Sequence, residues 1–250
     1  MSISLRVSRS VAFAHLSVAD QPGDGWRLQV ASARRHGSDV FLNLIQVPTP
    51  FRFSMKMERL LEIVPKLPAQ TLVVMIDALD VLFNHSMHHL VASFQQEVGR
   101  LGRDKFGRLT SIMCNGERNC WPDPSWASRF PEETLRKPLP FLNSGVLLGS
   151  REAVGAVLQR FPWIAKTDDQ AYWMNAYLES LENPELPRIE IDHFGILACC
   201  FFRQPLADLA CRNGVIYYRE QGTRPCLLHF NGPTKKIMPQ IASQIGVNLA

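Results

Sequence analysis

The sequence lacks several patterns that would assign it quickly to a class of protein. Its six cysteines include no C-x-x-C pair and no spacing typical of a zinc site, so we expect most of them to be small core residues. No apolar run approaches the length of a membrane-spanning helix. The G-x-G-x-x-G motif of dinucleotide-binding proteins is missing, and so are internal repeats and low-complexity tracts.

A strong charge of one sign is missing as well. The net charge is +4, and the Lys and Arg residues are scattered apart from short clusters such as Arg34-Arg35 and Lys235-Lys236. This distribution argues against nucleic acid as a partner and is compatible with an anionic small ligand such as a nucleotide. With 46% hydrophobic residues in 250, the chain can bury a full core, and we expect one domain over residues 1–250.

The N-terminal segment mimics a signal peptide, because Arg6 and Arg9 precede the apolar stretch VAFAHLSVA. His15 and Ser17 interrupt that stretch, so we interpret it as a first strand. On this interpretation we expect a cytoplasmic, reducing location.

Apolar runs that alternate with amphipathic segments predict an α/β fold built on an open sheet. The predicted strands cover residues 10–18, 40–47, 72–76, 109–114, 188–202, 215–218 and 225–230. Two predicted helices cover residues 26–35 and 90–101. Three more are predicted from their start signals: one after a cap at Ser54, one after a cap at Ser150, and one that begins at Thr167.

The most informative stretch is TLVVMIDALDVLFN, residues 71–84. The apolar run 72–76 is typical of a strand buried on both faces, and it leads directly into Asp77 and Asp80. Ligands of open α/β sheets bind beyond the carboxyl ends of the strands, and carboxylate oxygens suit Mg²⁺ or Mn²⁺. The alternative is that both are ordinary turn residues that bind the backbone.

Two other side chains have both a functional and an ordinary interpretation. Lys56 lies in the first turn of a predicted helix, where a cation opposes the dipole unless an anion is near; otherwise it is simply solvated. Trp121 lies in the loop NGERNCWPDP, which also carries Glu117, and its indole could stack on a sugar or a base. The same loop could be an ordinary connection at the surface.

Polar residues interrupt the apolar segment FLNSGVLLG at Asn143, Ser144 and Gly145. This pattern indicates either close approach of the backbone to a ligand or a β-bulge. Asp168 and Asp169 follow Thr167 at a predicted helix start, where the dipole favours acids, so periodicity alone favours a structural role for the pair.

The last predicted strand ends in His229, which Asn231, Gly232 and Lys235 follow. A histidine here could complete a metal site, and the residues after it could surround phosphates, although a lone histidine is usually structural. To bring His229 to Asp80, we expect the last strand to lie beside the acidic strand in one sheet.

Six segments taken together resemble the glycosyltransferase domain of the procollagen lysyl hydroxylases and collagen glycosyltransferases: MIDALDVLF, ERNCWPD, FLNSGVLLG, TDDQAYW, IDH and LHFNGPTK. The resemblance covers about residues 10–245. It implies a GT-A-like open, twisted, mixed sheet with a Rossmann-like nucleotide-binding half, flanked by helices. It also implies retaining transfer of glucose or galactose from a UDP-sugar, with Mn²⁺ or Mg²⁺ on the diphosphate. The implied acceptor is a hydroxyl of a peptide or glycan, such as hydroxylysine or galactosyl-hydroxylysine of a collagen-like peptide.

The resemblance also implies roles for individual residues. The implied metal ligands are Asp77, Asp80 and His229. The implied catalytic residues are Asp168 and Asp169, with Trp121 over the sugar. The implied donor-binding residues are Lys56, Asn143, Ser144, Asn231, Gly232 and Lys235.

The chain departs from the family pattern at three places. Leu79 stands where the family commonly has an aromatic residue, the acidic run is only Asp168-Asp169, and residues 199–202 differ after Asp192-His193. Leu79 and the short acidic run keep open a non-catalytic nucleotide-sugar-binding relative. A metal-dependent sugar-nucleotide hydrolase or nucleotidyltransferase is the other alternative, because the same carboxylates would serve water or phosphate as the acceptor. The expected partners are the UDP-sugar, the acceptor and a second copy of this chain in a homo-oligomer, with neither nucleic acid nor a membrane.

Overall fold

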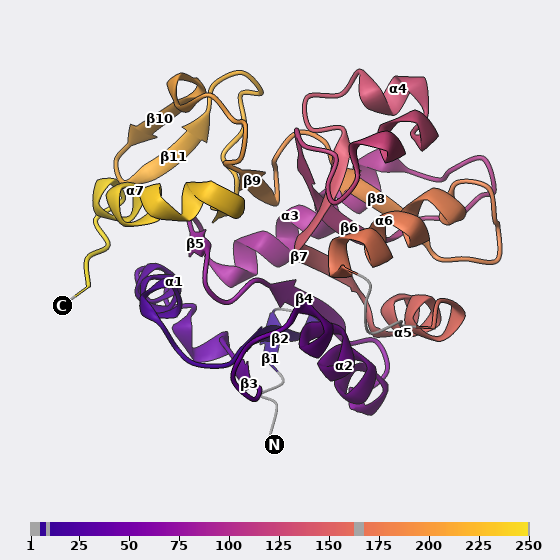
Figure 1. The fold of residues 1–250 in the computed structure, drawn as a ribbon, viewed down its shortest axis with the longest axis horizontal. Coiled ribbons are helices and arrows are strands. Elements are labelled where there is room, and N and C mark those ends of the chain that lie inside the picture. The colour runs from indigo at the N-terminus through magenta and orange to yellow at the C-terminus, as the bar shows by residue number, and fades with distance from the viewer. Residues whose placement is uncertain (1–5, 9–10, 163–167, 250) are drawn as a thin grey trace.

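A mixed β-sheet forms the centre of the computed structural model, which describes residues 6–8, 11–162 and 168–249 (Figure 1). Among these residues, seven strands join in the order β1-β2-β4-β7-β6-β8, with β3 beside β2. Their bounds are β1 (Arg6–Ser8), β2 (Val11–Ala19), β3 (Leu44–Gln46), β4 (Leu72–Ile76), β6 (Thr110–Glu117), β7 (Phe141–Ser150) and β8 (Arg188–Asp192). Strands β2, β3 and β4 are parallel, whereas β7 runs antiparallel to both β4 and β6. The predicted mixed α/β sheet is confirmed.

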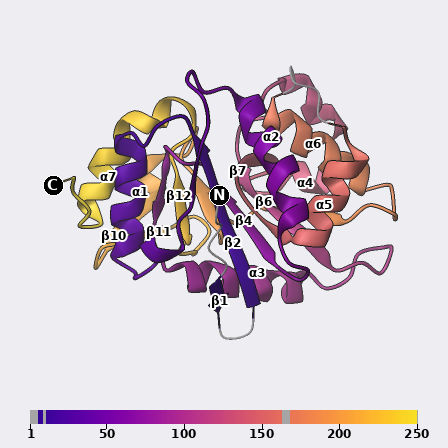
Figure 2. The same ribbon diagram turned by 90° about the horizontal axis from the view of Figure 1, so that it is seen from below.

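Helices cover both faces of this sheet (Figure 2). On one face lie α2 (Phe53–Ile63), α5 (Arg151–Arg160) and α6 (Asp169–Ser180), and on the other lies α3 (Met87–Leu101). Strand β4 contributes to both cores, because Val73 and Met75 pack with the first group and Val74 and Ile76 with the second. All five residues of β4 are buried, as the apolar run predicts.

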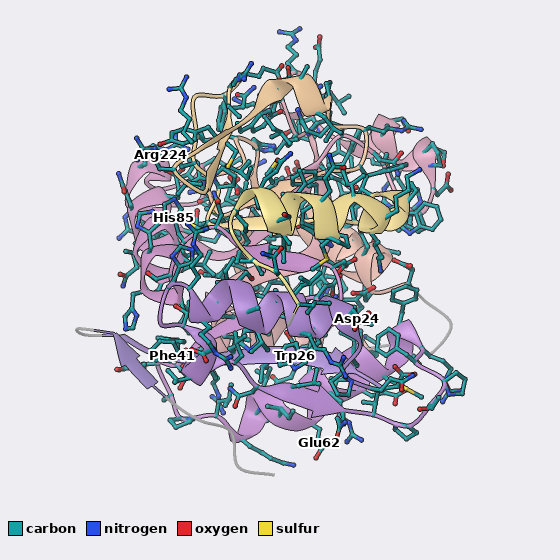
Figure 3. The ribbon with its side chains drawn as sticks, turned by 90° about the vertical axis from the view of Figure 1, so that its left-hand side faces the viewer. Asp24, Trp26, Phe41, Glu62, His85 and Arg224 are labelled. Carbon is teal, nitrogen blue, oxygen red and sulfur yellow. The ribbon has the colours of Figure 1, made fainter. Side chains whose placement is uncertain are left out.

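A smaller three-stranded sheet stands beside the main one. It consists of β5 (Val81–Phe83), β12 (Leu227–His229) and β9 (Ala198–Cys200), in the order β5-β12-β9. Helices α1 (Asp24–Arg34) and α7 (Met238–Gln244) pack over it, with the hairpin β10 (Leu209–Arg212) and β11 (Val215–Tyr218) nearby. Figure 3 shows α1 and α7 side by side, with Asp24 and Trp26 projecting from α1.

The expectation that the last strand lies beside the acidic strand in one sheet is wrong. Strand β12 pairs instead with β5, which begins directly after the acidic turn, and His229 lies opposite Val81. The backbone N–H of Phe230 donates to the carbonyl of Asp80 over 2.7 Å. Because residues 77–80 alone separate β4 from β5, the last strand still reaches the acidic turn.

Three predicted elements differ in extent. Residues 40–47 form only the short strand β3 after a 3₁₀ turn over Asp39–Phe41. Residues 188–202 form two strands, because the buried carboxylate of Asp192 accepts the backbone N–H groups of residues 196–198 and turns the chain. Strand β6 runs three residues further than expected, to Glu117.

Two helix starts also differ from the prediction. Helix α2 begins at Phe53 after Arg52, so Ser54 is inside the helix and is not its cap. The expected cap Thr167 lies outside the described residues, and the N-cap of α6 is Asp168. The predicted Ser150 cap is confirmed, since its hydroxyl accepts the N–H of Ala153.

Two of the expectations drawn from composition can be compared with the structure. Five of the six cysteines are buried and Cys211 is exposed, so the interpretation of most of them as core residues is confirmed. Within the described ranges, no helix has the length and apolar character needed to cross a membrane.

We predict that Asn84→Ala destabilises the small sheet. The buried Asn84 amide donates to the carbonyls of Ile216 (2.9 Å) and Pro225 (2.8 Å) and accepts the N–H of Ile216 (2.8 Å). Alanine leaves these buried backbone groups without partners, so the free energy of unfolding should fall by at least about 2 kcal/mol in urea titrations. The exposed Asn248→Ala serves as the control, and equal midpoints for the two variants would contradict the prediction.

Candidate functional site

A cavity of about 420 Å³ lies at the end of β4, where the two sheets meet. It is lined by nearly all of the side chains that the sequence singled out, although they come from distant parts of the chain. These are Asp77, Asp80, Trp121, Asn143, Ser144, Asp168, Asp169, His229, Asn231, Gly232 and Lys235. Lys56 is the exception, and it lies behind the cavity wall.

Asp77, Asp80 and His229 form a group that could hold a metal ion, and it is the single such cluster in the described part of the chain. His229 Nε2 lies 3.6 Å from Asp77 Oδ2 and 3.7 Å from Asp80 Oδ2. This nitrogen is buried and has no hydrogen-bond partner. Two carboxylate oxygens and an orphaned imidazole nitrogen within 4.8 Å of one another suit a divalent cation of the Mn²⁺ or Mg²⁺ type.

The charges around this group are unevenly balanced. Burial would raise the pKa of Asp80, but His229 and Lys235 outweigh burial and lower it to about 2, so Asp80 stays ionised. Burial would lower the pKa of His229, but Asp80 and Asp77 outweigh burial and raise it. Negative charge is thus concentrated around the orphaned nitrogen, as a cation site requires.

Gly145 allows the imidazole to occupy this position. A Cβ atom at residue 145 would lie 2.1 Å from His229 Cε1, far inside van der Waals contact. The backbone therefore does approach another group closely, and that group is His229; Gly145 also lines the cavity, so close approach to a ligand stays a prediction. The alternative of a bulge also holds, because the register between β6 and β7 shifts between Cys114 and Asn115, opposite Asn143.

Lys56 is a buried cation shared by two carboxylates. Its Nζ lies 2.7 Å from Asp77 Oδ1 and 2.7 Å from Asp169 Oδ2, and it also donates to the carbonyl of Ser144 over 3.2 Å. Burial would lower the pKa of Lys56, but Asp169 and Asp77 outweigh burial and raise it, so the ammonium stays charged. The anions that explain a lysine in the first turn of α2 are therefore the protein's own.

Asp168 and Asp169 have different environments although they are adjacent. Asp168 caps α6, since its Oδ1 accepts the N–H groups of Gln170 (2.9 Å) and Ala171 (3.3 Å). Burial and the neighbouring Asp169 raise the pKa of Asp168. Asp169 is 4% exposed, and its Oδ2 accepts the Ser144 hydroxyl over 2.9 Å in addition to its ion pair. Asp168 thus has the structural role at the helix start that was expected for both acids.

Glu117 is a cavity residue that sequence reasoning placed in a surface loop. It ends β6, is 1% exposed, and accepts hydrogen bonds from the amides of Gln170 (2.5 Å), Asn231 (2.8 Å) and Asn143 (3.3 Å). Burial raises its pKa against the effect of these donors. The available signal was its position at the end of an apolar strand, the same pattern that pointed to Asp77.

Aromatic side chains line the cavity near the solvent. Trp121 is 52% exposed and Phe53 60%, and Phe202 also contributes to the lining. Gln170 Nε2 donates to the Trp121 backbone carbonyl over 3.3 Å, and the Trp121 side chain lies near enough to Asp168 to oppose the rise in the pKa of that carboxyl. The indole is therefore held over the same end of α6 that presents the two acids.

Comparisons with known proteins give a consistent result. The family model of the PLOD GT domain matches residues 54–248. A multifunctional procollagen lysine hydroxylase and glycosyltransferase of Caenorhabditis elegans is 26% identical over 193 residues, which cover 71% of this chain and 23% of that protein. A procollagen-lysine,2-oxoglutarate 5-dioxygenase of Drosophila melanogaster is 26% identical over 233 residues, covering 88% of this chain and 30% of that protein.

This chain thus spans less than a third of the length of these two relatives. Among solved structures, a glycosyltransferase involved in the glycosylation of the major capsid of PBCV-1 aligns with a TM-score of 0.49 and 12% identity. That alignment covers 93% of this chain and 97% of the other.

We predict that Gly145→Ala displaces His229 and destabilises the protein. The added methyl group must push the imidazole or the β7 backbone aside, and overpacking of this kind costs about 1–3 kcal/mol. The control is Gly155→Ala in α5, where the nearest atom to the new Cβ is 4.0 Å away; there alanine should stabilise the helix by about 0.5–1 kcal/mol. Chemical denaturation measures both, and a shift of the same sign and size in the two variants would count against the close contact.

Proposed function

Since the chain belongs to the PLOD GT domain family, we propose that it transfers glucose or galactose from a UDP-sugar to a hydroxyl acceptor, with Mn²⁺ or Mg²⁺ and with retention of anomeric configuration. The observation that carries the proposal is the meeting of Asp77, Asp80 and the orphaned Nε2 of His229 at the wall of the cavity. The names of the relatives, which refer to procollagen lysine, make hydroxylysine or galactosyl-hydroxylysine of a collagen-like peptide the first acceptors to try.

The charge of the site supports binding of a cation first and of a diphosphate after it. Three carboxylates, Asp77, Asp80 and Asp169, are in ion-pair contact with only two ammonium groups, those of Lys56 and Lys235, and Asp168 and Glu117 line the same cavity. A divalent cation held by the two acids of the turn and by His229 would add two positive charges to this acidic site. The site would then attract a nucleoside diphosphate more strongly than it does without the ion.

The donor's phosphates would face the segment after β12. Lys235 Nζ lies 3.0 Å from Asp80 Oδ2, and its side chain is 56% exposed, so it is free to reach an adjacent phosphate oxygen. Gly232 lines the same wall with φ +59°, a conformation that favours glycine. When bound, the cation would neutralise negative charge on the departing UDP, and Lys235 would stabilise the same charge.

The sugar and the acceptor would lie toward α6. Lys56 neutralises Asp169 and the Ser144 hydroxyl donates to it, so its carboxylate is held in place and we assign it to positioning. Asp168 has a raised pKa, which makes it a stronger base than an ordinary aspartate, and we assign it to orienting or deprotonating the acceptor hydroxyl. The amides of Asn143, Gln170 and Asn231 point to Glu117 and form a polar wall beside the sugar.

The test is a panel of UDP-sugars with Mn²⁺, with and without a hydroxylysine-containing collagen-like peptide, read out as UDP release and as mass gain of the peptide. Transfer predicts release that depends on the acceptor. Release that proceeds equally without any acceptor would support a sugar-nucleotide hydrolase instead. UDP binding without release would support a non-catalytic nucleotide-sugar-binding relative, and absence of both binding and release would refute the proposal.

We predict that Asp80→Asn lowers Mn²⁺-dependent UDP affinity by at least about tenfold while the protein stays folded. The reason is that the charge of Asp80 faces the cation site and is not needed to fill the core. Titration calorimetry with UDP, in the presence and absence of Mn²⁺, measures the effect. The matched control is Asp24→Asn on the surface of α1, where the side chain is 74% exposed. Equal affinities in the two variants would refute the assignment of the turn as the metal site.

We predict that Asp168→Asn lowers turnover by about 10²-fold or more and leaves UDP affinity unchanged. Asparagine caps helices as well as aspartate does, so the start of α6 should stay intact and only the negative charge is removed. Asp123→Asn is the control, because Asp123 also caps a helix but is exposed and does not line the cavity. Normal turnover of Asp168→Asn would limit this residue to helix capping.

A further inference from the structure

The second ring nitrogen of His229 faces a thiol. Cys200 Sγ lies 3.5 Å from His229 Nδ1, and the two residues are direct register partners in the parallel pair of β9 and β12. Both side chains are buried, each with 1% exposure. Asn115 Nδ2 donates to the same sulfur over 3.0 Å. The imidazole thus has the two acids at one nitrogen and Cys200 at the other.

This arrangement bears on which nitrogen carries the proton. A neutral imidazole holds one proton, and a cation can bind through Nε2 only when that proton is on Nδ1. An acceptor placed at Nδ1 favours this tautomer and fixes the ring plane, as the outer partners of metal-binding histidines generally do. An acceptor at Nδ1 therefore controls both the tautomer and the orientation of the His229 ring.

Resting on the proposed function, we infer that Cys200 is a positioning residue whose sulfur accepts the Nδ1–H of His229 and so presents a bare Nε2 to the cation. Residue 145 can be nothing larger than glycine beside Cε1, so the ring is enclosed from that side as well. The Asn115 amide restrains the sulfur from the other side. The ring therefore has little freedom to turn Nε2 away from Asp77 and Asp80.

The neighbouring Cys199 provides a matched comparison. Side chains of consecutive residues in a strand point to opposite faces, and Cys199 packs with Leu139 and Tyr218 instead of facing the histidine. Both thiols are buried to the same degree, at 0% and 1% exposure. Loss of either thiol removes a similar volume from the core, but only the loss of Cys200 removes a partner of His229.

The experiment measures Mn²⁺ affinity of the full chain without any sugar nucleotide, from the electron paramagnetic resonance signal of free Mn²⁺. We expect Cys200→Ala to weaken binding by at least about tenfold, as loss of an outer partner of a metal ligand does. Cys200→Ser, which keeps an acceptor at this position, should restore most of the affinity, and Cys199→Ala should leave it unchanged. Circular dichroism and thermal unfolding confirm that each variant is folded.

His229→Ala separates the failure of this inference from the failure of the proposed function. If His229→Ala weakens Mn²⁺ binding and Cys200→Ala does not, the role of Cys200 is wrong and the metal site stands. If His229→Ala has no effect, the metal site itself is wrong, and the inference falls with it. Should Cys200→Ala not fold, Cys200→Val replaces it, because valine fills the space without accepting a hydrogen bond. Equal affinities of the valine and serine variants would also overturn the proposal.

Discussion

The arrangement of the acids in the site depends on one buried ammonium group, that of Lys56. Asp77 and Asp169 approach the same Lys56 nitrogen at 2.7 Å each; Lys56 and Asp169 are buried, and Asp77 is partly exposed at the cavity. Without the ammonium group, the charge of Asp169 would be buried without an ionic partner, and removing one partner of a buried pair commonly costs about 3–5 kcal/mol. The ion pairs also join three elements, since Lys56 belongs to α2, Asp77 to the turn after β4, and Asp169 to α6.

The remaining parts of the site are brought together by a connection between the two sheets. The main sheet supplies the acidic turn at the end of β4, whereas the small sheet supplies His229 at the end of β12. These residues meet because β5 leaves the acidic turn and pairs at once with β12. The candidate metal ligands therefore depend on a strand pair that is distant in sequence, and the core of Leu82, Leu228 and Phe230 around α1 and α7 stabilises that pair.

The sequence predicted correctly those features that depend on neighbouring residues alone. The buried strand β4, the acids after it and the cap at Ser150 follow from apolar periodicity and capping chemistry, and the structure has all three. The partner of β12 could not be predicted in this way, since strand pairing is decided by contacts that no short window contains. The sequence predicted that Lys56 lies in the first turn of a helix, but it could not predict the two partners, because Asp77 and Asp169 lie 21 and 113 residues further along the chain. Glu117 was misplaced because its burial comes from amides on three other elements.

Three consecutive residues of β7 serve three different parts of the cavity. Asn143 contacts the carboxylate of Glu117, Ser144 contacts Asp169, and Gly145 lies against His229. Consecutive Cα atoms joined by a trans peptide are about 3.8 Å apart, a spacing that covalent geometry sets and that holds even where the register of β7 shifts. Strand β7 thus keeps its contact with the imidazole two residues away from its contact with the buried glutamate. Variation in the surrounding loops can therefore reshape the opening of the cavity while the part of its wall between His229 and Glu117 stays the same.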